Sequence, residues 1–250
     1  MNAPLAGKVA LVTGAGKNIG RAIALRLAAD GAAIVVNGRS DEAAIKAVAE
    51  EITVAGGRAM AYRADITKPE EVAAMAAAVA AQFGGVDILV TNAGLRRQTS
   101  FLDMSFAEWR EILSVALDGA FIITQAFAQQ MIARGGGSII GLSGISTHVG
   151  TPNRAHVSAS KSGLEGLMRA LAVELAPKGI RANCVAPGAV DTVRGASAGS
   201  MPSTLADNGI PMRRRASVAE IADVVRMLAG PEGGYITGQT IHVNGGAFLT

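Results

Sequence analysis

The alternation of short, uninterrupted apolar runs with segments of helical periodicity constrains the fold more than any other feature of this chain. Runs that are apolar at nearly every position are typical of strands buried on both faces of a parallel sheet. Between them, apolar residues such as Ile19, Ile23 and Leu27 recur every three or four positions, as on a helix with one face on a core. The predicted strands are residues 9–12, 33–36, 59–62, 86–90, 138–142, 180–185 and 240–243.

The same alternation predicts how the chain is divided into domains. The chain has 250 residues, half of them apolar, which is enough for a sizeable core. No internal repeat and no linker rich in Pro, Gly and Ser interrupts the pattern. We therefore predict an α/β fold with about seven strands in one doubly wound parallel sheet, helices on both faces, and a single domain over residues 1–250.

The charge distribution does not indicate a nucleic-acid or membrane partner. The formal net charge is only +3, without the clustered basic stripe that follows a phosphate backbone. The one basic run, residues 213–215, lies in a predicted loop, where solvated arginines are the common explanation. Cys184 is the only cysteine, which excludes an intrachain disulfide and favours a reducing compartment. With no secretory signal and no apolar run of membrane-spanning length, we expect a cytoplasmic protein.

A long segment at residues 190–217 breaks the rhythm of strands and helices. It is rich in Gly, Ser, Ala and Pro and leaves the C-terminal end of a predicted strand. Open α/β sheets bind ligands at that edge, and loops of this length in compact domains are usually lids or binding loops. We predict that the segment closes over a substrate or cofactor, although a tolerated surface insertion is the alternative.

A Gly-rich turn at residues 13–20 follows the first predicted strand and opens the first predicted helix. Gly14 permits the tight turn, and Gly20 allows the helix to pack closely on the sheet. The first helical turn then presents unpaired N–H groups and a positive dipole end to a pyrophosphate. The context therefore predicts a dinucleotide site.

The residues after the second strand bear on which dinucleotide binds. Arg39 and Ser40 stand where a carboxylate would accept hydrogen bonds from a ribose 2′-hydroxyl, and no acid is present. Arg39, together with Lys17, suits the dianionic 2′-phosphate because charge-assisted contacts to phosphate are strong. We predict NADP(H) in preference to NAD(H); a solvent-facing arginine is the alternative interpretation of Arg39.

Motifs spread over essentially the whole chain resemble the short-chain dehydrogenase/reductase family, most closely its branch of 3-oxoacyl-carrier-protein reductases. The resemblance implies a Rossmann-type domain, usually a homotetramer, that reduces carbonyls or oxidises alcohols of small molecules with NADP or NAD. It also implies helical contacts between subunits at residues 109–134 and 158–175. The motifs are the turn at residues 13–20, Asp65, residues 92–94, Lys161, residues 187–192 and residues 238–246.

The resemblance assigns further cofactor contacts. Asp65 and Ile66 are expected to border the adenine, and Asn92, Ala93 and Gly94 to line the middle of the cofactor. The segment that closes over the nicotinamide would contribute Pro187, Gly188, Val190 and Thr192.

Within the Gly-rich turn, Asn18 and Ile19 complete the predicted contacts. Asn18 stands where the family has a second turn glycine. Asparagine is the non-glycine residue that best tolerates a left-handed backbone, so we expect the turn to be intact.

By the same resemblance, the residues that handle the proton are replaced. In the family, a tyrosine four residues before the active-site lysine donates the proton, a serine orients the carbonyl, and an asparagine completes the set. Lys161 fits the lysine, but the other three positions are Val157, Gly144 and Ala116. Valine has no ionisable group, so no environment can make it a general acid. The resemblance therefore predicts that the family's usual mechanism is not possible here.

Nearby residues offer partial compensation. Ser143 adjoins Gly144 and can replace the serine only if the strand has already ended or bulged there. His156 adjoins Val157, but one helical residue turns a side chain by about 100°, so a locally bonded histidine is the alternative. His148 lies in the loop after the fifth strand, within possible reach. We name Lys161 as retained, with Ser143 and His156 as tentative catalytic residues, and we predict no metal site.

Two hypotheses follow from these residues. The first is an NADP-dependent oxidoreductase with an altered proton donor; dienoyl-CoA reductases of the same family also lack the tyrosine and reduce a polarised alkene. The second is a catalytically silent NADP-binding protein that acts as a sensor or oligomer partner, motivated by the three replaced positions together. Nucleic-acid binding, which rests only on the basic residues, ranks last.

Overall fold

The computed structural model describes residues 3–193 and 209–250, and within them all seven predicted strands are present. The strands form one parallel sheet in the order β3-β2-β1-β4-β5-β6-β7. The prediction of a doubly wound parallel sheet is confirmed. The strands are β1 Val9–Val12, β2 Ala33–Gly38, β3 Ala59–Arg63, β4 Ile88–Thr91, β5 Gly137–Leu142, β6 Ile180–Pro187 and β7 Thr240–Val243.

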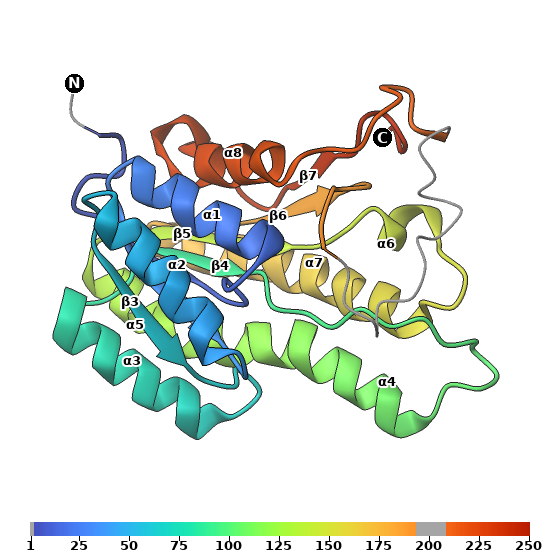
Figure 1. The fold of residues 1–250 in the computed structure, drawn as a ribbon, viewed down its shortest axis with the longest axis horizontal. Helices are drawn as coiled ribbons and strands as arrows, with labels where there is room; N and C mark the ends of the chain where they lie inside the picture. Colours follow the sequence, from blue (N-terminus) through green and yellow to red (C-terminus); the bar gives the residue numbers. More distant parts are fainter. Residues whose placement is uncertain (1–2, 194–208) are drawn as a thin grey trace.

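Helices cover both faces of this sheet in two layers (Figure 1). One layer consists of α1 (Asn18–Ala29), α2 (Glu42–Val54) and α8 (Val218–Ala229), whose buried residues share a core with one face of the strands. The other layer consists of α3 (Pro69–Phe83), α5 (Gly119–Ala133) and α7 (Ala155–Leu175). Strands that are apolar on both faces are needed for this arrangement, which explains the continuous apolar runs in the sequence.

Local sequence signals set the ends of several helices. Asp41 caps α2 by accepting a hydrogen bond from the Ala44 N–H at 3.0 Å. Ser217 and Glu220 form a reciprocal capping box at the start of α8, so the long segment predicted to end at Ser217 does end there. Gly84, in the left-handed conformation, closes α3.

Residues 106–133 are helical throughout, with α4 (Phe106–Leu113) joined to α5 by a π-helical turn at Ser114–Asp118. By length and composition this 28-residue run could cross a membrane. The sequence expectation concerned unbroken apolar runs, and this helical run is interrupted by charged residues such as Glu108, Arg110 and Asp118. In the structure 44% of the most apolar stretch is buried, and α5 packs on the sheet as a core helix. Burial inside the protein accounts for its apolar character without a membrane.

The order of the strands places the functional edge of the sheet. β1 is hydrogen-bonded to both β2 and β4, so the chain reverses its direction of progress across the sheet between these neighbours. In open α/β sheets a crevice forms at such a switch point, beyond the carboxyl ends of the strands. The loops that follow β1, β4, β5 and β6 meet there.

Candidate functional site

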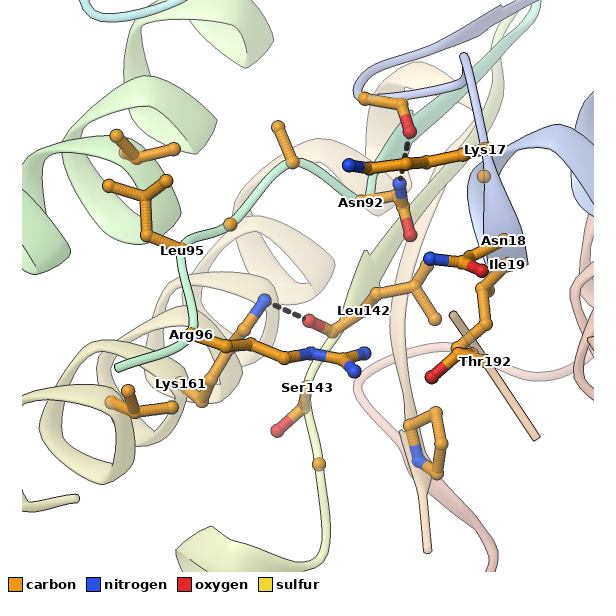
Figure 2. Close-up of a pocket in the computed structure, with 18 of the residues that line it drawn as sticks. Lys17, Asn18, Ile19, Asn92, Leu95, Arg96, Leu142, Ser143, Lys161 and Thr192 are labelled. Atoms are coloured by element: carbon orange, nitrogen blue, oxygen red, sulfur yellow. Dashed lines mark hydrogen bonds between the residues drawn. The ribbon is translucent and has the colours of Figure 1, made fainter. Parts of the chain in front are cut away.

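A cavity of about 460 Å³ lies at the carboxyl ends of the strands, on both sides of the switch point (Figure 2). Every residue predicted from the sequence to contact the cofactor lies on its wall, so loops far apart in the chain meet in one place. Those residues are Gly14, Lys17, Asn18, Ile19, Gly20, Arg39, Ser40, Asp65, Ile66, Asn92, Ala93, Gly94, Lys161, Pro187, Gly188, Val190 and Thr192.

The turn between β1 and α1 has the backbone conformations that its sequence predicts. Gly14 has φ of +61° and Asn18 has φ of +50°, so asparagine does occupy a left-handed position. A Cβ on Gly20 would lie 2.3 Å from the Gly14 carbonyl oxygen and 2.5 Å from Asn92 Nδ2. Only glycine fits at that position, which lets the start of α1 pack closely against the turn and the end of β4.

Asn92 fastens the turn to the neighbouring strand. Its Nδ2 donates to the carbonyl oxygens of Thr13 at 2.8 Å and Gly14 at 3.0 Å. In return, Thr13 Oγ1 accepts from the backbone N–H groups of Asn92 and Ala93, both at 3.0 Å. The sequence places Asn92 on the cavity wall, whereas its structural role is to lock the ends of β1 and β4 together (Figure 2).

The base of the long segment closes against the same turn. The Asn18 side chain donates to the Val193 carbonyl and accepts from the Val193 N–H, both at 3.0 Å. Val190 and Ala216 form a bridge that brings the two ends of the segment together. The central part of the predicted closing segment, residues 194–208, lies outside the described residues. The described base therefore joins the Gly-rich turn after β1 to the loop that follows β6.

Positive charge marks the rim at the end of β2. Arg39 is about half exposed, and its Nη1 lies 4.0 Å from Asp65 Oδ2, a long and weak ion pair. The Asp65 carboxylate is already held by Thr67, whose N–H and Oγ1 donate to Oδ1 at 2.9 and 2.8 Å. The Arg39 guanidinium therefore keeps donors available for an anion on this rim.

Lys161, on α7, reaches the floor of the cavity between β4 and β5. Its Nζ donates a short hydrogen bond to the Leu142 carbonyl (Figure 2) and faces Gly94, where an added Cβ would lie 3.4 Å away. Burial, with a smaller contribution from the Arg96 charge, lowers the pKa of Lys161 to about 8. The ammonium therefore loses its proton only slightly above neutral pH.

Two further cations line this half of the cavity, and sequence reasoning missed both. Arg96 follows residues 92–94 and points into the cavity (Figure 2), and Arg154 is 6% exposed just before α7. The only acidic residue on the described part of the wall is Asp65, which follows β3. The surroundings of Lys161 are therefore cationic. An arginine in a loop has no sequence pattern that distinguishes it from a solvated one.

The three positions at which the resemblance leads us to expect a tyrosine, a serine and an asparagine are also near the cavity. Val157 and Gly144 lie on its wall, and Val157 is 7% exposed. Ala116 is buried in the π-helical turn, next to Val115, which lines the cavity. Apolar or absent side chains thus occupy the wall around Lys161 at these positions.

Of the two tentative catalytic residues, only Ser143 lines the cavity. β5 ends at Leu142, so Ser143 lies just beyond the strand, and its Oγ donates a short hydrogen bond to Glu165 Oε1. His156 is fully buried, bonds to Glu108 at 3.2 Å, and does not line the cavity. The locally bonded alternative therefore describes His156 better than the catalytic one.

Comparisons with known proteins agree with this architecture. Residues 14–247 match the family described as enoyl-(acyl carrier protein) reductase. The chain is 40% identical to a 3-oxoacyl-(acyl-carrier-protein) reductase of Staphylococcus epidermidis over 243 residues, covering 97% of this chain and 99% of that one. It is 39% identical to the reductase of the same name from Aquifex aeolicus, covering 99% and 100%.

A solved structure extends the agreement to three dimensions. A Sinorhizobium meliloti protein described as a short-chain alcohol dehydrogenase superposes with a TM-score of 0.92 at 36% identity, over 99% of this chain and 98% of that one. The Gly-rich turn, the strand order and the cavity agree with these comparisons. The chain therefore belongs to the short-chain dehydrogenase/reductase family of oxidoreductases.

Proposed function

We propose that this protein is an NADP-dependent oxidoreductase that transfers hydride to or from a small carbonyl or alcohol, or an activated alkene, without a tyrosine proton donor. The observation that carries the proposal is Lys161, held at the cavity floor beside Gly94 while Val157 occupies the wall one helical turn earlier. The lysine favours a bound anion or developing oxyanion, and the valine can supply no proton.

NADP(H) suits the described wall. Gly14 and Gly20 let the turn and the start of α1 pack against Asn92, where an added Cβ would collide, and the first turn of α1 lines the cavity where a pyrophosphate would lie. Lys17 and Arg39 would hold the 2′-phosphate, and residues 92–94 and 187–192 would hold the centre and the nicotinamide. When bound, this cofactor supplies the hydride-transfer chemistry.

The residues of the chain itself determine how charge is handled near the reacting carbon. Lys161, with a pKa of about 8, is mostly charged at neutral pH and stabilises negative charge on a substrate oxygen. Arg96 adds positive potential on the same side. An oxygen that becomes negative is therefore stabilised in this half of the cavity before it receives a proton.

The names of the relatives indicate which substrates to examine first. They are described as reductases of 3-oxoacyl and enoyl groups on acyl carrier protein, a ketone and an alkene conjugated to a thioester. We propose the same chemical classes here. We also propose that the chain is a single domain, cytoplasmic, and a homotetramer whose contacts use residues 109–134 and 158–175.

Turnover tests the proposal. NADPH oxidation should be measured with ketones, 3-oxoacyl thioesters and enones, alongside the NADPH dissociation constant. We expect measurable turnover with at least one class, and its loss in Lys161→Ala. Tight NADPH binding with no oxidation across all three classes would contradict the proposal and would favour the silent NADP-binding protein.

A further inference from the structure

A buried carboxylate lies behind the cavity wall and is in hydrogen-bond contact with three side chains. Glu165 is on α7, one turn after Lys161, and its side chain is 5% exposed. Its Oε1 accepts from Ser143 Oγ and from Thr147 Oγ1 at 3.3 Å, and lies 3.1 Å from His148 Nε2. Buried carboxylates are costly unless they are fully hydrogen-bonded, so the site is built around this group.

The cluster connects the cavity with the protein surface. Ser143 lines the cavity at one end. At the other end, the His148 side chain is 23% exposed, so its ring can exchange protons with water. Lys161 does not belong to the cluster, because its Nζ is bonded to the Leu142 carbonyl. Glu165 is thus the only described link between the serine and the histidine.

The outer end of the cluster is fixed by ring contacts. The His148 ring stacks on Phe248, with ring centroids 5.2 Å apart, and meets His242 edge-on at 4.6 Å. Burial and the neighbouring His148 lower the pKa of His242. Cys184 also faces the cluster, and burial with the Glu165 charge raises the pKa of its thiol to about 12. Both neighbours therefore stay neutral near pH 7.

We propose that Ser143, Glu165 and His148 form a proton relay that replaces the missing tyrosine. The inference rests on the proposed oxidoreductase function. The structure assigns Ser143 to the substrate oxygen, Glu165 to the middle and His148 to the solvent end.

The proton balance can be written for alcohol oxidation. The substrate O–H proton would pass to Ser143 Oγ as the Oγ–H proton passes to Glu165 Oε1, while the substrate carbon would give its hydride to the oxidised nicotinamide cofactor of the proposed function. Glu165 then transfers the proton to His148 Nε2, which is unprotonated in the Nδ1–H tautomer, and the resulting imidazolium returns to that tautomer by releasing one proton to water. Ser143 is never left as an alkoxide, so its high intrinsic pKa is not an obstacle. Carbonyl reduction uses the same bonds in reverse.

The test compares Glu165→Gln and His148→Ala with Thr147→Val. The control removes the Thr147 Oγ1 contacts to the same Glu165 oxygen at 3.3 Å and to the Gly144 carbonyl at 2.9 Å, but leaves the path from cavity to solvent intact. We expect Glu165→Gln to lower kcat by about 10²-fold or more, with an NADPH dissociation constant within twofold of the wild type. His148→Ala should lower kcat, change the solvent deuterium isotope effect on kcat, and regain turnover when imidazole is added. Thr147→Val should show neither the changed isotope effect nor a rescue by imidazole.

A measurement without cofactor or substrate adds an independent readout. When the wild-type protein is acidified, the Nε2–H of the His148 imidazolium, the form that the relay produces, should donate to Glu165 and give a downfield proton resonance. Glu165→Gln should move that resonance upfield, because an amide oxygen is a weaker acceptor than a carboxylate.

The two proposals fail in different ways. Wild-type protein that binds NADPH but turns over no substrate would contradict the oxidoreductase function and the relay together. Turnover that is active in the wild type and unchanged in folded Glu165→Gln would overturn the relay alone. If Glu165→Gln does not fold, His148→Ala decides, because its side chain is partly exposed; full turnover without imidazole would overturn the relay.

Discussion

The two ends of the cavity differ in the protein atoms that shape them: main-chain atoms at one end and side chains at the other. The end at β1 and α1 is shaped by backbone: Gly14, Asn18 and Gly20 hold a turn in which the nearest atoms to any added side chain are mostly main-chain or Asn92. The end at α7 is shaped by side chains, with Lys161 and Arg96 on the wall and a buried carboxylate behind it.

This difference explains why side chains at the α7 end can be exchanged, whereas the turn at β1 and α1 tolerates few substitutions. A backbone cradle leaves few substitutions that preserve its shape, because a new Cβ collides with atoms that cannot move aside. At the other end, side chains can be exchanged on an unchanged helix and strand. A protein can therefore retain a dinucleotide site while the proton-handling groups beside it differ.

The largest expected effect comes from filling the cradle. Gly20→Ala would place a Cβ 2.3 Å from the Gly14 carbonyl oxygen, so we expect a loss of about 3 kcal/mol or more of folding free energy and no measurable NADPH binding. Denaturant unfolding and NADPH titration check both. The matched control is Gly144→Ala at the other end, where the nearest atoms are 3.9 Å away. Equal damage from both substitutions would break the contrast between the two ends.

Lys161 gives the next largest effect, as a dependence of stability on pH. Its folded-state pKa is about 8, below the ordinary lysine value of 10.5. The cost of burying the ammonium is fully present below pH 8 and disappears as pH rises toward 10.5, so stability should rise across that window by at most about 3 kcal/mol. The wild type and Lys161→Met should be compared by denaturant unfolding from pH 7 to 10.5. A pH dependence identical in both proteins would show that Lys161 does not carry this cost.

Arg96 affects the pKa of Lys161 and therefore the same pH dependence of stability. Its charge is a secondary cause of the lowered pKa of Lys161, so Arg96→Ala should raise that pKa and move the rise in stability to higher pH. An unchanged midpoint would show that burial alone sets the pKa.

Arg39 gives a smaller effect, confined to one cofactor. Arg39→Ala should weaken NADPH binding about 10- to 100-fold, the loss of a charge-assisted contact, and leave NADH binding unchanged. Arg63→Ala is the control, because Arg63 is exposed and pairs with Glu42 away from the cavity. If Arg39→Ala weakened both cofactors equally, Arg39 would have no role in selecting the 2′-phosphate.

The fold and the backbone end of the cavity could be predicted because their signals are local. Continuous apolar runs mark the strands, and the left-handed conformation of Asn18 follows from its place in a turn that needs positive φ. The reciprocal bonds between Asn18 and Val193 could not be predicted, because they join residues 175 positions apart.

The arrangement of side chains at the α7 end could not be predicted from the sequence, because it depends on tertiary packing. Glu165 has the sequence appearance of a solvent-facing helix residue, and only the packing of α7 on β5 shows that it is buried. The sequence places His156 beside Val157 and so suggests a catalytic role, but in the structure its side chain is hydrogen-bonded to Glu108. Ser143 was predicted only on the condition that the strand ends before it, and β5 does end at Leu142.

Restoring the family residues tests the central claim most directly, namely that the cavity has kept its cofactor end and changed only its proton-handling groups. NADPH-dependent ketone reduction should be measured for the wild type and for the combined variant Ala116→Asn, Gly144→Ser and Val157→Tyr. We expect a gain of about 10²-fold or more, the size of one general acid contribution, with NADPH affinity unchanged. A folded variant that binds NADPH as the wild type does and shows no gain would contradict it.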